Sequence, residues 1–488
     1  MHNVLVIHTD QHHAGCLGAA GNPQIKTPNL DALAADGVMY TNSFCSFPVC
    51  TPSRYSLLSG LYVREHGGSS NHCTLSDDIP TFATLLRDAG YHTKAVGKMH
   101  FAPTYLDVGF SEMELSEQDG PGRWDDDYHR YLLLHGLIDY NDIQDQRSEY
   151  RDLAPSEYWE KSGALESNLP EKYHSTTWIG ERTVAAIDKW NADQPALLMV
   201  GFIKPHHPFD PPAPWTDMYN PDELDLLPGW TEACLEDDFA FHKGYFSHNQ
   251  LTESTLRRVM AYYYASISQI DYQIGIIVDK LKEKGLYEKT MIVFTSDHGD
   301  YMGYHHMLLK GNHLYEPLAK VPLLIKYPEE LSAGTVDDRL VNNIDIAPTI
   351  LRQNGLAQPF RMKGFDLFED QAGHETIFSE GRPDSRIVMA RNLRYKLIRS
   401  FDEESESGNL FFDLEKDPLE MDNRIDDPAY AAEIAKLTTA IDNWKAETPY
   451  KPHHLDKSAP QVSRTCDYFD ITSADLQQRY DEAFHAID

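Results

Sequence analysis

Four short apolar runs, each followed at once by polar residues, constrain the fold of this 488-residue chain more than any other feature. They are residues 4–7, 93–96, 196–202 and 291–295, and helical segments separate them. Such alternation predicts a parallel α/β sheet, because parallel strands need crossover connections that are usually helices. We therefore expect a large, mostly parallel central sheet that is flanked by helices.

Signals for helix ends accompany these runs. Segment 28–36 follows Thr27 and stops at Gly37, a pattern that is typical of a capped helix. Further helices are expected over 80–89, 253–284 and 345–353. Together the helices and strands predict one large doubly wound domain that covers residues 1–374.

Two stretches interrupt this pattern, and the chain changes character near its end. The irregular insertions 109–173 and 208–249 are expected to shape a pocket. Residues 375–445 are predicted to form a small antiparallel subdomain with a helix, from strand-like runs at 376–379, 387–391, 395–399 and 410–414 and a helical run at 430–445. The tail, residues 446–488 with a helix over 473–487, is expected to wrap the chain's own surface or a neighbouring subunit of a homo-oligomer.

The chain is strongly acidic. Its 76 acidic and 43 basic residues give a formal net charge of −33, which disfavours nucleic acid and anionic membranes as partners. Residues 1–7 enter the first strand without a basic leader, and no stretch reaches the length of a membrane span, so a cytoplasmic location is expected. The six cysteines, at positions 16, 45, 50, 73, 234 and 466, form no CxxC pair and are expected to be reduced thiols.

Polar residues follow each of the four apolar runs. Asp10 and Gln11 follow the first run, Lys98 and His100 the second, His206 the third, and Asp297 and His298 the fourth. The carboxyl ends of parallel strands share one edge of a sheet, where ligands bind. All four groups are therefore expected to meet at a single site.

Four of these residues form a set that is suited to a metal ion. Asp10, Gln11, Asp297 and His298 supply two carboxylates, an amide oxygen and an imidazole. Oxygen-rich sets suit a hard divalent cation such as Ca²⁺, with Mn²⁺ as the alternative because of the imidazole nitrogen. Singly, Asp10 is more simply a turn residue and His298 a core histidine. Their combination favours the metal site.

The stretch around Cys50 predicts a nucleophile position. Thr51 is an acceptable N-cap and Pro52 a favoured first helical residue, so a helix is expected from Pro52 to Ser59, closed by Gly60. Residue 50 then lies at a helix N-terminus, where free N–H groups favour an anion. A buried structural cysteine is the simpler alternative.

The stretch Cys50-Thr51-Pro52-Ser53-Arg54 resembles the signature at which type I sulfatases, members of the alkaline phosphatase superfamily, oxidise cysteine to formylglycine. The resemblance extends to residues 97–100, 204–206 and 297–299, and to Lys310. It implies an alkaline phosphatase-like sandwich, sulfuric ester hydrolase activity, and a formylglycine-generating enzyme as maturation partner.

The resemblance also implies a role for each matching residue. Residue 50, as formylglycine hydrate, would bind the metal with the four ligands above and attack sulfur. Arg54 and Lys98 would hold the nucleophile and neutralise the sulfate oxygens. His100 would deprotonate the second hydroxyl of residue 50, and His206 or Lys310 would protonate the departing alkoxide.

Departures from the common sulfatase pattern leave the substrate open. Gln11 and His298 resemble the choline-sulfatase-like and phosphonate monoester hydrolase-like branches, and Asn71 and the His305-His306 pair are compatible with substrate binding in the latter. A choline substrate would need an aromatic and acidic cage. Its candidates are Tyr105, Trp124, Asp125 and Asp126, with an exposed acidic loop as the alternative.

Three functions follow from these observations. Foremost is hydrolysis of a small-molecule or saccharide sulfate ester, and the negative net charge favours small esters over long polyanions. The second is hydrolysis of a phosphonate monoester or phosphodiester on the same scaffold. The third is a catalytically silent protein that binds sulfated ligands, which the presence of every expected catalytic residue type disfavours.

Overall fold

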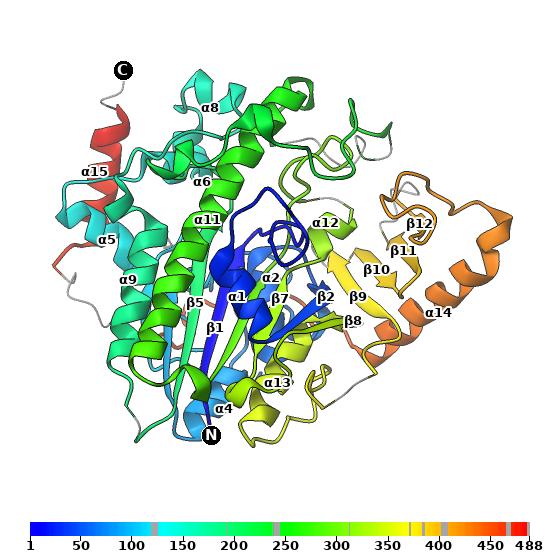
Figure 1. Ribbon diagram of the computed structural model, residues 1–488, viewed down its shortest axis with the longest axis horizontal. Helices are drawn as coiled ribbons and strands as arrows, with labels where there is room; N and C mark the ends of the chain where they lie inside the picture. The colour runs from blue at the N-terminus through cyan, green and yellow to red at the C-terminus, as the bar shows by residue number, and fades with distance from the viewer. Residues whose placement is uncertain are drawn as a thin grey trace.

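A mixed sheet of eight strands forms the centre of the molecule (Figure 1). This computed structural model describes residues 1–488 except 119–124, 192, 237, 239–244, 312, 370–371, 383–385, 402–407, 465–469 and 486–488. The strands are β1 (Asn3–Asp10), β2 (Val38–Phe44), β3 (His92–Gly97), β4 (Glu112–Leu115), β5 (Ala196–Pro205), β6 (Thr290–Ser296), β7 (Leu323–Lys326) and β8 (Thr335–Asn342). Their order is β4-β3-β5-β1-β6-β7-β2-β8.

The sheet is parallel except at β7. Strand β1 pairs in parallel with β5 and β6, and β3 pairs in parallel with β5 and β4. Strand β7 runs antiparallel to both β6 and β2. The predicted large, mostly parallel sheet is therefore confirmed.

Helices cover both faces of the sheet, as successive residues of β1 show. Val4 and Val6 pack in a cluster with α2 (Cys50–Ser59), α4 (Phe82–Asp88) and α13 (Ile346–Gln353). Leu5 and Ile7 face the opposite cluster, formed with α1 (Pro28–Ala35), α9 (Ser175–Asp188) and α11 (Glu253–Glu283). Because side chains alternate along a strand, an uninterrupted apolar run indicates burial on both faces.

Further helices surround this core. They are α3 (Val63–His66), α5 (Asp127–Leu134), α6 (Tyr140–Gln146), α7 (Ser148–Arg151), α8 (Ser156–Glu160), α12 (Glu316–Ala319), α14 (Ala431–Glu447) and α15 (Ser473–His485). Helices α5 to α8 belong to the insertion 109–173. In Figure 1 this insertion lies near the end of the sheet where the arrow of β1 points.

Helix α2 begins earlier than the sequence predicts. Cys50 is its first residue and Val49 its N-cap, so the expected N-cap role of Thr51 is wrong. The Thr51 hydroxyl instead donates to the carbonyl oxygen of His100 at 2.6 Å. Gly60 ends the helix with φ 65°, a left-handed conformation in which glycine avoids the strain of a side chain.

A second sheet of four antiparallel strands follows. It contains β9 (Ile377–Gly381), β10 (Ile387–Arg391), β11 (Tyr395–Ser400) and β12 (Leu410–Asp413), in the order β12-β11-β10-β9. Helix α14 buries Leu437, Ile441 and Trp444 against it. The small antiparallel sheet is confirmed, and the proposed domain boundary at residue 374 lies between α13 and β9.

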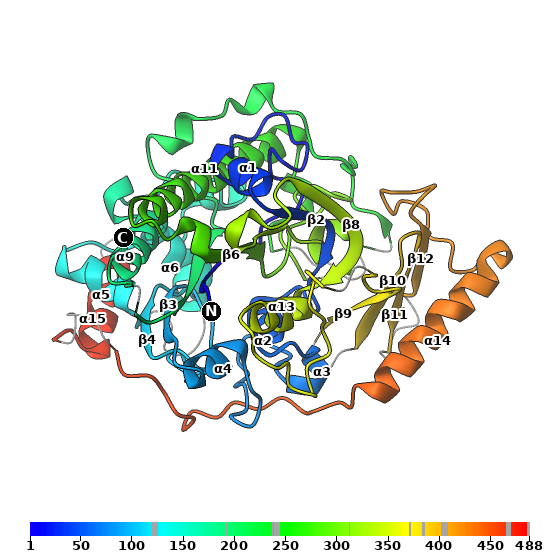
Figure 2. The same ribbon diagram turned by 60° about the horizontal axis from the view of Figure 1, so that its bottom comes forward.

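The C-terminal tail wraps its own chain. Figure 2 shows it running from α14 along the lower edge of the molecule to α15. On the way, Lys451 N–H donates to the carbonyl of Arg64 and Val462 N–H to the carbonyl of Tyr105. Tyr480 and Phe484 of α15 then pack in one cluster with side chains of the insertion 109–173. The tail thus connects the small sheet to the insertion.

Two further predictions concern cysteines and membranes. Cys16, Cys45, Cys50, Cys73 and Cys234 are free thiols, as expected, while Cys466 lies outside the described residues. Among the helices that the structure describes, none combines the length and apolar character needed to cross a bilayer.

Candidate active site

The polar residues that follow the four predicted strands meet at one place. Asp10 ends β1, and its Oδ2 lies 2.8 Å from Nζ of Lys98, just after β3. Its Oδ1 lies 3.7 Å from Nε2 of His298, after β6, and 4.0 Å from Nε2 of His206, after β5. All four side chains are nearly inaccessible to solvent. The structure therefore brings these four groups together at the carboxyl edge of the sheet.

Cys50 lies against the same residues. Its Sγ is 3.1 Å from Nζ of Lys310, 3.5 Å from Nε2 of His298 and 3.6 Å from Oδ1 of Asp10. The residue is 1% exposed. Because it is the first residue of α2, its side chain lies beside the N–H groups that begin the helix. The position combines a helix N-terminus with an ammonium and an imidazole.

The Cys50 thiol is held in its neutral form. Burial and the charge of Asp10 raise its pKa to about 11, although Lys310 and Lys98 act in the opposite direction. Nucleophilic cysteines have a lowered pKa, because the thiolate is the reactive species. The surrounding residues therefore do not activate a sulfur nucleophile at neutral pH.

Arg54 joins the two carboxylates of the site. Its Nη2 lies 2.9 Å from Oδ2 of Asp10 and 2.7 Å from Oδ2 of Asp297. Its Nε also donates to Asp297, and its Nη1 donates to the carbonyl of Lys98 at 2.6 Å. Every guanidinium nitrogen thus binds a group of the chain. Four of its five N–H groups are used in this way, so Arg54 holds the two carboxylates in place.

Asp10 is kept ionised despite complete burial. Burial alone would raise its pKa, but the charge of Lys98, with smaller effects of His206, Arg54 and Lys310, lowers the pKa well below its ordinary value. An ionised carboxylate is the form that binds a metal.

The described residues fit a divalent cation. Single ligand atoms of Asp10, Cys50, Asp297 and His298 all lie within 4.8 Å of one another. His298 Nδ1 bonds the carbonyl of Gly299 at 2.9 Å, which leaves the Nε2 lone pair directed to the site. Gln11 donates Nε2–H to Asp300 at 2.6 Å, and its buried Oε1 has no hydrogen-bond partner among the described residues. An orphaned amide oxygen beside two carboxylates suits Ca²⁺.

Lys310, whose Nζ lies 3.1 Å from Sγ of Cys50, also contacts two histidines of the site. Nζ of Lys310 is 3.1 Å from Nε2 of His206 and 3.1 Å from Nε2 of His298. His206 bonds the carbonyl of His207 through Nδ1 at 2.6 Å, so its Nε2 accepts from Lys310. Burial, followed by the charge of Lys310, lowers the pKa of His206 well below its ordinary value.

His100 lies beside the start of α2. Its residue is 2% exposed and has a positive φ of 59°. The carboxylate of Glu117 accepts its N–H, and Thr51 binds its carbonyl. Hydrogen bonds thus hold both the N–H and the carbonyl of this strained residue. The sequence did not predict Glu117 as part of the site.

The two predicted substrate-binding residues make contacts within the chain. Asn71 accepts the N–H of Thr51 through Oδ1 at 3.1 Å and so caps the first turn of α2. His305 is fully buried, with Nδ1 against Asp238 at 3.0 Å and Nε2 against the carbonyl of Leu419 at 2.9 Å. Its neighbour His306 also binds backbone carbonyls through both nitrogens. Neither histidine is placed at the nucleophile.

The aromatic and acidic cage is not formed by the residues expected for it. Tyr105 donates its hydroxyl to Asp127, Asp125 pairs with Arg130, and Asp126 binds His129 and the N–H of Glu117. Trp124 lies outside the described residues. The alternative, an exposed acidic loop, is also wrong for the two aspartates, because both are buried.

A buried polar network that the sequence did not indicate extends from Lys98. Gln118 accepts from Lys98 Nζ at 3.0 Å and donates to Asp142 Oδ1 at 3.1 Å. Lys204 lies 2.8 Å from Asp142 and 2.5 Å from Asp210. Among the residues beyond Lys98, only Lys204 was marked in the sequence, because it belongs to the stretch 204–206 that resembles the sulfatase pattern. Gln118 and Asp142 come from the irregular insertion, where no pattern marks them.

Replacement of Gln118 by methionine is expected to lower kcat roughly tenfold with little change in KM, and to cost about 1–2 kcal/mol of stability, because Lys98 loses a buried partner. Steady-state kinetics and urea unfolding measure both. Gln194, an exposed glutamine that binds the carbonyl of Gly90, is the matched control, and Gln194→Met should change neither quantity. Unchanged kinetics in Gln118→Met would show that this network does not contribute to catalysis.

Asp145 of α6 forms a neutral pair with His207. His207 Nε2 lies 3.3 Å from Asp145 Oδ2, and the hydroxyl of Tyr245 donates to the carboxyl. Burial, followed by the charge of Asp142, raises the pKa of Asp145 to about 8, while burial lowers that of His207 well below its ordinary value. His207 in turn stacks on His206, with ring centroids 4.2 Å apart.

The raised pKa of Asp145 makes stability depend on pH. Between about pH 4 and 8 the folded state holds a proton that the unfolded state releases, so the free energy of unfolding falls as pH rises through this window. Asp145→Asn keeps the acceptor oxygen but removes the titration, so its stability should fall less. Urea denaturation at several pH values tests this, with the exposed Asp193→Asn as control. If the free energy of unfolding falls with pH by the same amount in wild type and in Asp145→Asn, the prediction is wrong.

Comparison with known proteins agrees with this geometry. A sulfatase family model matches residues 2–356, and a model of the N-sulphoglucosamine sulphohydrolase C-terminal region matches residues 303–447. An arylsulfatase of Clostridium perfringens is 31% identical over 468 residues, which cover 89% of this chain and 92% of the relative. A choline-sulfatase of Rhizobium meliloti is 27% identical and covers 91% of this chain and 87% of the relative.

A solved structure shares the fold. The phosphonate monoester hydrolase of Agrobacterium radiobacter superposes with a TM-score of 0.76 at 24% identity, covering 95% of this chain and all of the other. The chain therefore has the same fold as this hydrolase. The chain belongs to the sulfatase family and is a sulfuric ester hydrolase.

Proposed function

We propose that Cys50 is converted to formylglycine, whose hydrate supplies an oxygen nucleophile for sulfate ester hydrolysis and a second hydroxyl for its release. The observation that carries this proposal is the thiol itself. Its pKa of about 11 opposes thiolate chemistry, yet Lys310, His298 and Asp10 all approach its sulfur. These contacts support an oxygen nucleophile at this position.

We further propose a divalent cation, Ca²⁺ with Mn²⁺ as the alternative, held by Asp10, Gln11, Asp297, His298 and residue 50. When bound, it would supply Lewis acidity toward a sulfuryl oxygen. The Nε2 lone pair of His298 and the Oε1 of Gln11, which no described residue contacts by a hydrogen bond, support this ligand set. Arg54 keeps the two carboxylates in place, and Lys98 adds a positive charge beside Asp10.

Lys310 is the proposed proton donor to the departing alkoxide. Burial lowers the pKa of His206, whereas nearby negative charges, among them those of Asp10 and Asp297, raise that of Lys310 despite its burial. At neutral pH the proton in their 3.1 Å contact therefore resides on Lys310. His206 would orient the ammonium through its Nε2 lone pair. His100 is proposed to take the proton from the second hydroxyl of residue 50.

A small-molecule or saccharide sulfate ester is the proposed substrate. The net charge of −33 repels long polyanions, and the two relatives reported above are named for aryl and choline esters. We propose a cytoplasmic location, the formylglycine-generating enzyme as a transient partner, and no nucleic-acid or membrane partner. We also propose a homo-oligomer.

Sulfate release from 4-nitrophenyl sulfate, choline sulfate and a sulfated monosaccharide tests the proposed substrate class, with a phenyl phosphonate monoester and a phosphodiester as comparison substrates. A higher kcat/KM for at least one sulfate ester is expected. A higher value for the phosphonate or diester would favour the second candidate, which the fold of the phosphonate monoester hydrolase supports. If protein whose Cys50 is fully converted to formylglycine binds sulfate esters without hydrolysing them, the chain is a catalytically silent protein that binds sulfated ligands.

A further inference from the structure

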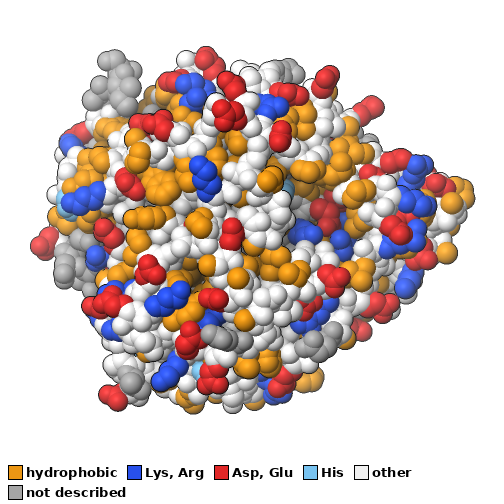
Figure 3. Space-filling view, viewed as in Figure 1, with side chains coloured by type: hydrophobic (Ala, Val, Ile, Leu, Met, Phe, Trp, Pro, Cys, Tyr) orange, Lys and Arg blue, Asp and Glu red, His pale blue; other side chains and the backbone are white. Residues whose placement is uncertain are grey.

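A large cavity lies apart from the nucleophile, where the main sheet meets the C-terminal sheet. Its volume is about 810 Å³, and the lining residues include neither Cys50 nor the proposed metal ligands. The wall is formed by residues 13–15, 17, 19–24, 39–41, 225–228, 264, 304, 316–317 and 320–324, with 391, 393, 414 and 418–419 from the small sheet's side. Figure 3 shows a hollow right of centre in which Lys, Arg, Asp and Glu side chains gather. A cavity of this size takes a small organic molecule.

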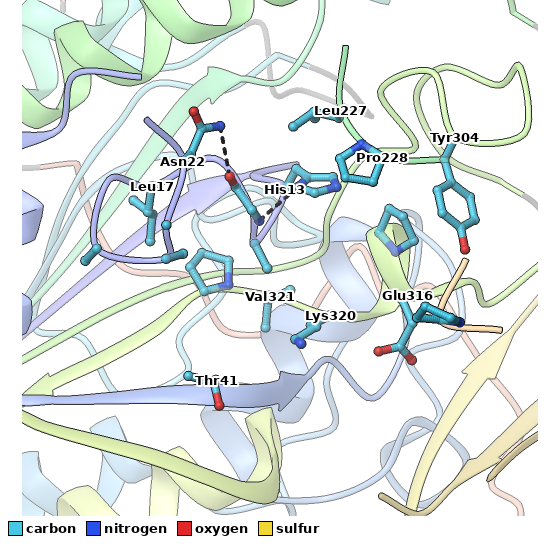
Figure 4. A pocket seen from close by; sticks show the side chains of 18 of the residues that line it. His13, Leu17, Asn22, Thr41, Leu227, Pro228, Tyr304, Glu316, Lys320 and Val321 are labelled. Atoms are coloured by element: carbon cyan, nitrogen blue, oxygen red, sulfur yellow. Dashed lines mark hydrogen bonds between the residues drawn. The ribbon is translucent and has the colours of Figure 1, made fainter. Parts of the chain in front are cut away.

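Most of the lining is apolar. The side chains of Leu17, Pro23, Leu227, Pro228, Val321 and Leu323 contribute to it. Figure 4 shows Leu227 and Pro228 on one side of the cavity and Val321 on another. Such a surface gains free energy when it covers a hydrocarbon body.

Lys320 is a partly buried cation for which the described residues provide no ion pair. Its Nζ donates to Asn42 Oδ1 at 3.3 Å, and no carboxylate of the described residues lies within ion-pair distance of it. Glu316, the nearby carboxylate, is already bound by Arg391 and Lys396. Burial lowers the pKa of Lys320 although the charge of Glu316 acts in the opposite direction, so the ammonium has lost water that only a more distant carboxylate partly replaces.

His13 offers a second donor to the same cavity. Its Nδ1 accepts the N–H of Gly15 at 2.9 Å, so the ring proton is on Nε2, for which the structure gives no acceptor among the described residues. Figure 4 shows His13 and Lys320 among the side chains around the cavity. An ammonium and an imidazole N–H beside an apolar surface suit an oxyanion on a hydrocarbon body.

We propose that this junction cavity binds a small amphipathic carboxylate. The carboxylate pairs with Lys320 and accepts from His13, while the apolar body lies against the leucine and proline side chains. The site is separate from the sulfate ester site, so its occupation does not depend on the proposed nucleophile.

Titration calorimetry with 2-naphthoate, and with the neutral 2-naphthamide of the same shape, tests the proposal. Wild-type protein should bind 2-naphthoate at one site, and 2-naphthamide roughly tenfold to a hundredfold more weakly, because a charge-assisted bond is worth about 1.5–3 kcal/mol. Lys320→Met should weaken 2-naphthoate by the same factor and leave 2-naphthamide unchanged. Lys289→Met, which removes an exposed lysine, is the charge control and should bind as wild type does.

A second pair of variants separates the two sites. Lys310→Met, beside Cys50, should retain 2-naphthoate binding. Leu227→Glu places a negative charge on the half-buried apolar wall and should weaken the binding of 2-naphthoate. This second variant keeps the test decisive if Lys320→Met fails to fold. Absence of saturable binding, or binding that is lost in Lys310→Met and kept in Lys320→Met, would overturn the proposal.

Discussion

Cys50→Ala is expected to lower kcat/KM for every sulfate ester by roughly 10⁴-fold or more, as removal of a covalent nucleophile does in other hydrolases. The variant leaves Asp10, Arg54 and the other polar residues in place, so substrate binding should change little. Because Cys50 is packed at the first turn of α2, loss of its sulfur should cost only modest stability. Sulfate release and thermal unfolding measure the two effects.

Two controls make this result specific. Cys73→Ala removes another buried free thiol and should retain most of the activity. Cys50→Ser keeps a single hydroxyl without the second one that formylglycine hydrate offers, so a slow turnover or a trapped ester is expected. Activity of Cys50→Ala close to that of wild type would show that the nucleophile lies elsewhere.

Arg54→Met is expected to destabilise the metal-free protein by about 3–5 kcal/mol, because two buried carboxylates lose the cation that they share. The side chain is 1% exposed, and it binds Asp10 and Asp297 at 2.9 and 2.7 Å. Methionine keeps much of the volume but none of the charge. Urea unfolding of the chelator-treated protein gives the free energy directly.

Calcium should restore part of the stability of Arg54→Met, since a ligand that binds only the folded state stabilises it in proportion to its affinity. Arg87→Met is the matched control: its pair with Asp107 is about one third exposed, and its loss should cost about 0–1 kcal/mol. Equal stability of Arg54→Met and wild type, or no response of the variant to Ca²⁺, would contradict the assigned role of Arg54 and the proposed ligand set.

The sequence predicted the strands that carry the site, for a clear physical reason. Strands β1, β5 and β6 are buried on both faces and therefore contain apolar runs, whereas β3, with the sequence HTKAVG, buries Thr93 and Lys94 beside Ala95 and Val96. Strand β2, with the sequence VMYTNSF, alternates buried and half-buried residues and lacks such a run. Strand β7 has four residues, too few to distinguish from a loop. Their pairing comes from the assembled sheet, which no local pattern encodes.

The polar side chains were predictable where they follow a strand and not elsewhere. Asp10, Lys98 and His298 were found because the ends of parallel strands converge. His305 has a suggestive neighbour in His306, but Asp238, 67 positions away, takes its ring nitrogen. Gln118 reaches Lys98 from an insertion whose helices pack against α15, over 300 positions later. Contacts of this kind depend on tertiary packing alone.

The mass of the peptide that contains residue 50, measured in enzyme whose sulfate release has been quantified, tests the central claim most directly. Protein produced with a formylglycine-generating enzyme should show formylglycine at this position, and specific activity should rise in proportion to the converted fraction. Preparations that retain only cysteine should be inactive. Full sulfatase activity from protein in which residue 50 is entirely unmodified cysteine would contradict the account.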